Sequence, residues 1–356
     1  MPLSFDNEIV ERLSMQLHRA KKVCIVSHQN PDGDAVGSAL ACSHWLREAF
    51  FAGEQKPEIS IVLPHPCLEE ALYLPGTKSI VNAKEDLPKC EQMLYDADLI
   101  WCVDFNAANR VVPLDKALNE SKAVKVVVDH HHNPDIQLFD TILTLPDLSS
   151  TCELLYWLFV QIIGDNSITT NTARCLYHGI NTDTGCFAYA NEDASLYEAT
   201  AALMRHPLQA AAVHNQIFNN YSIQKMKLLG FLLTERMKIF HDCGFAYIAV
   251  DDKDLEAHNA TSEDLEGLVN YTLMMAPMRV GALVKISEGK VRISFRSKDD
   301  FDVNDFARRH FGGGGHTKAS GATSPYDFNT TIKIMEENML RELRGKTNTS
   351  KYPDKH

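Results

Sequence analysis

The side chains best suited to chemistry are aspartates and histidines that follow directly on apolar or helical segments. They occur at four places along the chain: His28, Asp32 and Asp34; Asp104; Asp129, His130 and His131; and Asp183. Taken singly, an aspartate after a strand is commonly a turn residue or a helix cap. Side chains at the carboxyl ends of parallel strands meet at one edge of a sheet, however, and crowded carboxylates repel one another unless cations lie among them. The pattern therefore predicts a metal site.

The donor atoms of these side chains indicate which metal they would bind. All are carboxylate oxygens or imidazole nitrogens, and no thiolate is among them. Such donors favour Mn²⁺ or Mg²⁺, with Co²⁺ or Zn²⁺ as substitutes, over a cysteine-bound zinc. Two neighbouring ions activate a water molecule and neutralise the charge that develops on phosphate oxygens. We therefore expect two Mn²⁺ ions and the hydrolysis of a phosphate ester.

The elements that must position these side chains are strands and helices in alternation. Short apolar runs predict strands at residues 23–27, 59–63, 99–103 and 124–128. Helical spacing predicts helices at residues 5–20, 36–50, 151–163 and 172–179. The third of these helices opens with the capping-box pattern Ser150-Thr151-Cys152-Glu153. This alternation is typical of a parallel α/β sheet.

A second domain is expected after a helical linker at residues 193–224. Its predicted strands are 245–250, 281–286 and 291–295, and the last two are joined by a hairpin turn at 287–290. Helices are predicted around 262–274 and at 327–343. The length of 356 residues favours two domains over one. We expect a catalytic α/β domain at 1–192, a smaller α/β domain at 225–344, a cleft between them, and a disordered tail at 345–356.

The second domain also contains candidate anion-binding residues. Gly313, Gly314 and Gly315 stand before His316, with Ser320 nearby. A glycine run is commonly a flexible spacer, but glycines also let backbone N–H groups approach an anion closely. It is not a P-loop, because no Gly-Lys-Ser/Thr follows at the required spacing. Arg296, at a strand end, is either a solvated side chain or a fork for a phosphate.

The overall composition limits the possible functions. The chain is 45% hydrophobic and 23% charged, with a formal net charge of -12, which argues against coating long nucleic acid. Residues 270–322 nevertheless hold nine Lys and Arg against five Asp and Glu, which suits a small anionic substrate. The nine cysteines form no Cys-x-x-Cys pair and are expected to be reduced core residues. No signal peptide or apolar run of about 20 residues is evident, so we expect a cytoplasmic protein without membrane contact.

Together these motifs resemble those of the DHH phosphoesterases. The matching segments are His28 to Ala35, Asp104, Asp129 to His131, and Asn181 to Gly185. Gly313 to His316 and Ala319 to Gly321 resemble the signature of the C-terminal DHH-associated domain. The segments stand in the right order and cover nearly the whole chain. Size and spacing are most similar to the nanoRNases, which combine oligoribonuclease and phosphoadenosine-phosphate phosphatase activity.

The resemblance implies a role for each residue. One metal ion would be held by His28, Asp32, Asp104 and Asp183. The other would be held by Asp34, Asp104, His130 and Asp183. Asp129, His130 and His131 would form the catalytic group, in which Asp129 and His131 orient ligands or contact the attacking water and the scissile phosphate. Substrate would be bound by Arg296, Gly313, Gly314, Gly315, His316 and Ser320. The motif requires neither a fourth glycine nor His132, and no role is assigned to His132.

The resemblance also implies the substrates. We expect short 5′-phosphorylated oligoribonucleotides such as pApA, cleaved to mononucleotides, and also 3′-phosphoadenosine 5′-phosphate, cleaved to AMP. One alternative is a phosphodiesterase for cyclic di-AMP or linear dinucleotides. Another is a RecJ-like single-strand exonuclease, which is disfavoured because no further nucleic-acid-binding domain is evident. A non-enzymatic nucleotide-sensing module is disfavoured because every expected metal ligand is present. The oligomeric state is left open, with a homodimer possible.

Overall fold

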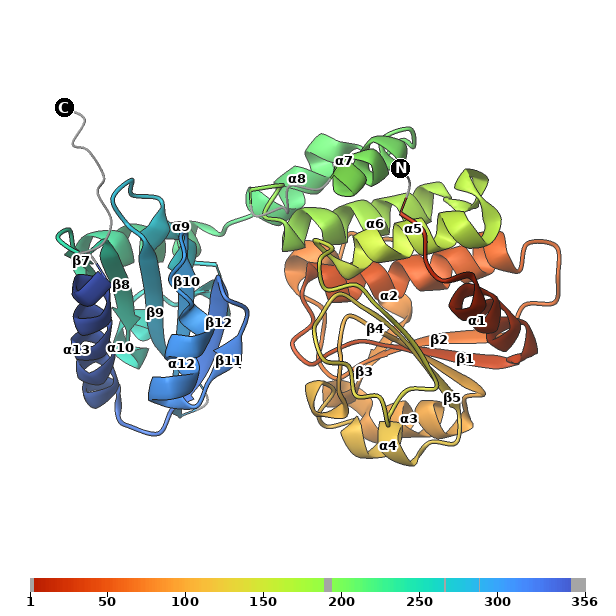
Figure 1. Cartoon of the computed structure of the whole chain (residues 1–356), viewed down its shortest axis with the longest axis horizontal. Helices are drawn as coiled ribbons and strands as arrows, with labels where there is room; N and C mark the ends of the chain where they lie inside the picture. Colours follow the sequence, from red (N-terminus) through yellow and green to blue (C-terminus); the bar gives the residue numbers. More distant parts are fainter. Residues whose placement is uncertain (1–2, 189–193, 266, 288, 347–356) are drawn as a thin grey trace. The chain divides into compact units, whose positions relative to one another are not determined.

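The computed structural model describes residues 3–188, 194–265, 267–287 and 289–346. The chain divides into two compact units, Met1–Asn220 and Tyr221–His356 (Figure 1). This division falls inside the segment 193–224 that was predicted to be a linker. The predicted tail, 345–356, lies outside the described residues from position 347 onward.

The first unit is built on a six-stranded sheet in which every neighbouring pair is parallel. The strands are β1 (Lys22–Val26), β2 (Glu58–Leu63), β3 (Ile80–Asn82), β4 (Leu99–Val103), β5 (Val124–Asp129) and β6 (Thr141–Thr144). Their order is β3-β2-β1-β4-β5-β6, and all five residues of the central strand β4 are buried. Burial on both faces explains the unbroken apolar runs in the sequence. The predicted parallel α/β sheet is confirmed.

Helices cover both faces of this sheet. They are α1 (Asn7–Arg19), α2 (Gly33–Trp45), α3 (Ala83–Asp96), α4 (Asp115–Glu120), α5 (Thr151–Ile163), α6 (Thr170–Asp183), α7 (Ala194–Leu203) and α8 (Ala210–Phe218). Alternate strand residues enter two apolar cores: Ile25 and Trp101 pack with α2, α5 and α6, whereas Val26 and Cys102 pack with α3 and α4. Figure 1 shows these two helix layers on opposite sides of the strands.

Most of the predicted linker is packed into the first unit. Helices α7 and α8 contribute Leu196, Leu203 and Val213 to the same core as α2 and α6. Apolar side chains at helical spacing in this segment serve that core, so residues 194–218 extend the first unit.

Close packing of α2 on α6 depends on two glycines. A Cβ atom on Gly37 would lie 2.7 Å from the carbonyl oxygen of Cys175, and one on Gly179 would lie 2.3 Å from Sγ of Cys152. Real Cβ contacts are not that short, so only glycine permits this approach. As a result the first turn of α2, which carries Asp34, lies directly against α5 and α6.

The second unit contains a mixed six-stranded sheet in the order β11-β12-β10-β9-β8-β7. Its strands are β7 (Met237–Phe240), β8 (Phe245–Val250), β9 (Val280–Ser287), β10 (Lys290–Ser297), β11 (Gly314–Gly315) and β12 (Ala319–Ser324). Strands β8 and β9 are parallel and the other neighbours are antiparallel. Ser287 pairs with Lys290, which confirms the predicted hairpin.

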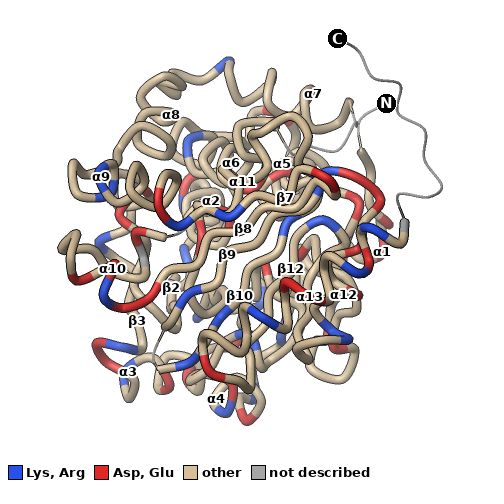
Figure 2. The backbone as a smooth tube through the Cα atoms, turned by 90° about the vertical axis from the view of Figure 1, so that its left-hand side faces the viewer, with Lys and Arg blue, Asp and Glu red and all other residues tan. Residues whose placement is uncertain are grey.

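The helices of the second unit lie against both faces of its sheet. They are α9 (Ile223–Phe231), α10 (Asp252–Ala257), α11 (Val269–Leu273), α12 (Val303–Phe311) and α13 (Phe328–Lys346). One core joins Phe295 to α12 and α13, and another joins Leu283 to α9, α10 and α11. Figure 2 marks Lys and Arg positions, including those of β10, in blue. Among the described helices, none is long and apolar enough to cross a bilayer.

Candidate metal centre

The aspartates and histidines predicted from four separate segments lie together at the carboxyl end of the parallel sheet. Three overlapping groups place one donor atom of each member within 4.8 Å of the others. The groups are His28, Asp32 and Asp104; Asp104, His130 and His131; and Asp34, His130 and Asp183. Because Asp104 and His130 each belong to two groups, the three form one continuous cluster.

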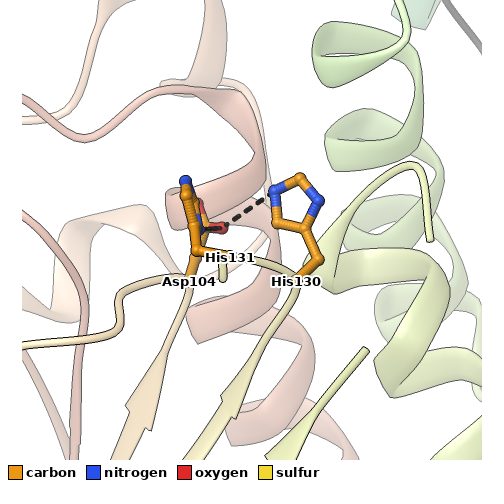
Figure 3. A group of neighbouring side chains, drawn as sticks. All are labelled: Asp104, His130 and His131. Atoms are coloured by element: carbon orange, nitrogen blue, oxygen red, sulfur yellow. Dashed lines mark ion pairs between the residues drawn. The ribbon is translucent and has the colours of Figure 1, made fainter. Parts of the chain in front are cut away.

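Asp104 lies at the middle of this cluster. Its Oδ2 atom lies 3.3 Å from Nε2 of His28, and its Oδ1 atom lies 3.6 Å from Nε2 of His130 and 3.8 Å from Nδ1 of His131 (Figure 3). The residue is buried and has a φ of 63°, a left-handed conformation that is uncommon for aspartate. Such strain persists where the surrounding structure requires it, often at functional sites.

Asp32 is both a helix cap and a member of the cluster. Its Oδ1 atom accepts hydrogen bonds from the N–H groups of Asp34 (3.1 Å) and Ala35 (3.0 Å), which caps α2. Its Oδ2 atom lies 3.8 Å from Nε2 of His28. Asp183 is the last residue of α6, and its Oδ2 atom lies 3.4 Å from Nε2 of His130.

Asp34 is held by the first amides of α5. Its Oδ2 atom accepts the N–H of Thr151 at 2.7 Å, and its Oδ1 atom accepts the N–H of Cys152 at 3.0 Å. The free N–H groups and positive dipole end of a helix stabilise such a carboxylate. The sequence indicated a helix start at Ser150, but it gave no sign that this helix end would hold Asp34.

Backbone carbonyls orient the two imidazoles that face these carboxylates. Nδ1 of His28 lies 2.8 Å from the carbonyl oxygen of Gln29, and Nδ1 of His130 lies 3.2 Å from that of Leu148. With Nδ1–H donated to a carbonyl, the Nε2 atom keeps its lone pair in the neutral imidazole. This is the arrangement that metal-ligating histidines ordinarily show.

The negative charge of the cluster is strong enough to shift several pKa values. Burial disfavours the charged form of His28, but Asp104 and Asp32 outweigh it and raise its pKa to about 9. Burial acts likewise on His130, where Asp183 and Asp104 dominate and raise the pKa to about 9. Burial followed by the charge of Asp104 raises the pKa of Asp34 to about 7, against the opposing effects of the charge of His130 and of the side chain of Cys152.

These residues fit divalent metal ions. Four carboxylates and two oriented imidazoles share a few ångströms. Without a cation their charge is neutralised by protons, since the pKa values of His28, His130, Asp34 and Asp183 are all raised, and a divalent ion can take the place of these protons. Oxygen and imidazole donors of this kind suit Mn²⁺, Mg²⁺ or Co²⁺, although they do not select among them.

Asp129 and His131 form a pair beside the cluster. Nδ1 of His131 lies 2.7 Å from Oδ1 of the fully buried Asp129, whose Oδ2 atom has no hydrogen-bond partner among the described residues. His132 differs from its two neighbours. Its side chain is exposed and belongs to none of the three groups, while its carbonyl oxygen accepts a hydrogen bond from Asn106 at 2.7 Å.

The glycine run of the second unit, for which a flexible spacer was the alternative to a substrate-binding role, is a packed strand. Gly314 and Gly315 form β11 and pair with Gly321 and Ser320 of β12. A Cβ atom on Gly313 would lie 2.2 Å from the carbonyl oxygen of Gly321, whereas one on Gly314 would meet only Oδ1 of Asn304, at 3.9 Å. Close approach of two backbones therefore explains Gly313.

The other predicted substrate residues lie in the same sheet. Arg296 is the register partner of Ala319, so it lies across β12 from the glycine strand, and its Nη1 donates to the carbonyl oxygen of Phe295 at 2.9 Å. His316 and Ala319 close the turn between β11 and β12 through mutual backbone hydrogen bonds. The hydroxyl of Ser320 donates to the carbonyl oxygen of Val303 at 2.6 Å, and its role as a phosphate donor stays a prediction.

Known protein families match both units. Residues 22–180 match the DHH family, N-terminal domain, and residues 244–343 match the DHHA1 domain. The chain belongs to the DHH family. It is therefore a phosphoesterase, a hydrolase, as predicted, and its two-domain architecture is that of this family. Phosphoesterases of the DHH family are metal-dependent, in agreement with the clustered donors.

Relatives of this DHH protein extend over most of its length. The "Bifunctional oligoribonuclease and PAP phosphatase NrnA" of Bacillus subtilis is 26% identical over 87% of this chain and 91% of that protein. A "Probable bifunctional oligoribonuclease and PAP phosphatase NrnA" of Streptococcus mutans is 27% identical over 85% and 89%. The crystal structure of an exopolyphosphatase-related protein from Bacteroides fragilis superimposes with a TM-score of 0.89 at 27% identity, covering 95% of this chain and 97% of that one.

Proposed function

We propose that this DHH protein hydrolyses short 5′-phosphorylated oligoribonucleotides to mononucleotides, and 3′-phosphoadenosine 5′-phosphate to AMP, with two Mn²⁺ ions. The observation that carries the proposal is the cluster around Asp104, in which buried carboxylates meet two imidazoles whose Nε2 atoms face them. The names of the Bacillus and Streptococcus relatives support the choice of substrates.

The cluster offers two overlapping sets of metal ligands. In our proposal His28, Asp32, Asp104 and Asp183 hold one ion, and Asp34, Asp104, His130 and Asp183 hold the other. Asp104 suits a shared position because its two oxygens face different imidazoles. When bound, the ions would activate a water molecule and neutralise charge on the phosphate.

The protein's own contribution next to the ions comes from Asp129 and His131. Nδ1 of His131 lies 2.7 Å from Oδ1 of Asp129, which fixes the orientation of the ring. We infer that the imidazole of His131 contacts the scissile phosphate and that Asp129 positions it for this contact.

The second unit supplies the contacts to the rest of the substrate in this proposal. Arg296 supplies a guanidinium and His316 an imidazole, both suited to a phosphate. Gly313, Gly314 and Gly315 let a substrate approach the backbone closely, although the N–H of Gly313 itself donates to the carbonyl oxygen of Ala307. The stretch from 270 to 322 carries an excess of four positive charges within a chain of net charge -12. A small number of phosphate contacts favours a short substrate over a long strand.

A substrate panel tests the proposal. Purified protein is freed of metal with a chelator, supplied with Mn²⁺, Mg²⁺ or Co²⁺, and offered five substrates. These are pApA, a 5′-phosphorylated pentaribonucleotide, a long single strand, cyclic di-AMP and 3′-phosphoadenosine 5′-phosphate. We expect the highest kcat/KM on pApA and the pentamer with Mn²⁺. A preference for cyclic di-AMP or for the long strand would replace this assignment. Nucleotide binding without turnover under any metal would indicate a sensing module.

A further inference from the structure

Thr151 contacts two carboxylates of the cluster with two different groups. Its backbone N–H donates to Oδ2 of Asp34 at 2.7 Å, and its hydroxyl donates to Oδ1 of Asp104 at 2.9 Å. All three residues are buried, with Thr151 fully so. Asp34 lies in α2 and Asp104 follows β4, so this one residue of α5 joins two elements that are far apart in the sequence.

The hydroxyl of Thr151 is not required to begin α5. That helix is already capped by Ser150, whose side chain accepts the N–H of Glu153 at 3.0 Å. A residue at the first helical position needs no hydroxyl, since only its N–H lacks a partner within the helix, and here that N–H donates to Asp34. The bond to Asp104 therefore has to be explained by the cluster itself.

This bond determines how the carboxylate of Asp104 is turned. With Oδ1 accepting from Thr151, the same oxygen faces His130 and His131, and Oδ2 faces His28. Rotation of the carboxylate would break the hydrogen bond and leave a buried hydroxyl unpaired, which is costly. Each oxygen of Asp104 is thereby assigned to one side of the cluster.

We propose that Thr151 is a positioning residue, which fixes the carboxylate of Asp104 so that one oxygen serves each of the two metal ions. The inference rests on the proposed two-metal function. It adds a residue that contacts neither ion and acts through Asp104. Partners that orient metal ligands in this way commonly contribute about 10- to 100-fold to metal affinity or activity.

Direct measurement of Mn²⁺ binding tests this role. Thr151→Val keeps the β-branched shape and the backbone N–H to Asp34 but removes the hydroxyl, whereas Thr151→Ser keeps the hydroxyl and removes the methyl group. Free Mn²⁺ is followed by electron paramagnetic resonance during titration of the chelator-treated protein. We expect Thr151→Val to bind Mn²⁺ about 10-fold or more weakly than wild type. Thr151→Ser should bind nearly as wild type does.

A buried threonine of the second unit provides the matched control. Thr331 is fully buried, and its hydroxyl lies 2.7 Å from Oγ of Ser324, so Thr331→Val makes the same chemical change at a hydroxyl that contacts none of the residues of the cluster. It should lose stability and keep wild-type Mn²⁺ affinity. If Thr151→Val does not fold, as judged by circular dichroism, Thr151→Ala replaces it in the comparison with Thr151→Ser.

The outcomes separate this inference from the proposed function. Wild-type affinity in the folded Thr151→Val protein would overturn the positioning role and leave the metal centre intact. Equal losses in Thr151→Val and Thr151→Ser would also overturn it, because the methyl group rather than the hydroxyl would then matter. Absence of Mn²⁺ binding in the wild type would overturn the two-metal function itself, and the role of Thr151 with it.

Discussion

Nδ1 of His131 lies 2.7 Å from Oδ1 of Asp129, and the aspartate is fully buried at the end of β5. A buried carboxylate in this position fixes the orientation of the histidine ring. The contact with Asp129 therefore fixes the orientation of the His131 ring without a bound metal ion. It resembles the support that an orienting aspartate gives to a catalytic histidine in other hydrolases.

Asp129→Asn should lower kcat by about 10-fold or more while the two metal ions remain bound. The amide keeps the size of the side chain but removes the carboxylate that holds Nδ1 of His131 in place. Steady-state kinetics on pApA and metal analysis of the same preparation measure the two effects. A variant that loses its metal along with its activity would instead make Asp129 a ligand.

Asp104→Asn should abolish turnover and remove the stabilisation that Mn²⁺ gives the wild-type protein. Asparagine tolerates the left-handed backbone found at this position, so the change tests the carboxylate rather than the φ of 63°. Ligand binding to the native state stabilises it by about 2.7 kcal/mol at 100 times Kd. Thermal unfolding with chelator and with excess Mn²⁺ should show this increase in wild type only. The same increase in Asp104→Asn would contradict the shared role of Asp104.

Arg296→Gln should lower kcat/KM on pApA by about 10- to 100-fold, the loss expected for a hydrogen bond to a charged group. On bis-p-nitrophenyl phosphate, which has no distal phosphate, the loss should be much smaller. Arg292→Gln is the matched control, because Arg292 lies on the same strand, four residues away. Equal losses on both substrates would indicate that Arg296 acts in the chemical step.

Gly315→Ala should destabilise the second unit by about 1–3 kcal/mol, whereas Gly314→Ala should change its stability little. Gly315 has a φ of 144°, and a Cβ atom there would lie 2.6 Å from the carbonyl oxygen of Ala319. At Gly314 the nearest atom would be 3.9 Å away. Urea unfolding of the two variants measures the difference, and equal stabilities would contradict the packed-strand description.

His178 should lower the free energy of unfolding of the first unit as the pH drops from 7 to 4, whereas Asp34, whose pKa is raised, acts in the opposite direction. Burial lowers the pKa of this imidazole from 6.5 to about 4, so below pH 6.5 the unfolded chain binds a proton that the folded chain does not. Stability is therefore lost with falling pH, by up to about 3 kcal/mol for this group.

Replacement of His178 isolates this contribution. His178→Asn removes the titrating group, which lies 3.0 Å from the hydroxyl of Tyr73. Urea unfolding in the presence of chelator should show a weaker dependence on pH in the variant than in wild type. Parallel pH profiles would assign the acid sensitivity to other groups.

Individual site residues could be predicted from the sequence because polar side chains follow directly on apolar runs. His28 follows β1 in this way, and Asp104 follows β4. The hydrogen bonds from α5 to Asp34 could not be predicted from the sequence, because Thr151 and Asp34 are 117 residues apart and no local sequence pattern indicates the contact. Strands β3 and β6, at the two edges of the sheet, have three and four residues. They are too short to show a hydrophobic periodicity and were not predicted.

In the second unit, too, some contacts of the candidate site residues could not be predicted from the sequence. A run of four glycines reads as a spacer by composition, but its tight packing depends on strand β12, which pairs with it. Ser320 is a candidate substrate contact by sequence, but the sequence does not reveal that its hydroxyl donates to the carbonyl oxygen of Val303. In both cases the deciding partner is a backbone atom, and backbone atoms carry no signature in the sequence.

The cluster draws on residues from His28 to Asp183, and this order has a consequence for biosynthesis. A nascent chain that has left the ribosome only as far as β5 carries Asp32, Asp34 and Asp104, but it lacks both the α5 amides that hold Asp34 and the carboxylate of Asp183. The ions of the proposed centre therefore cannot assist the early stages of co-translational folding. The apolar strands must assemble first, and metal loading becomes a late step that follows translation of α6.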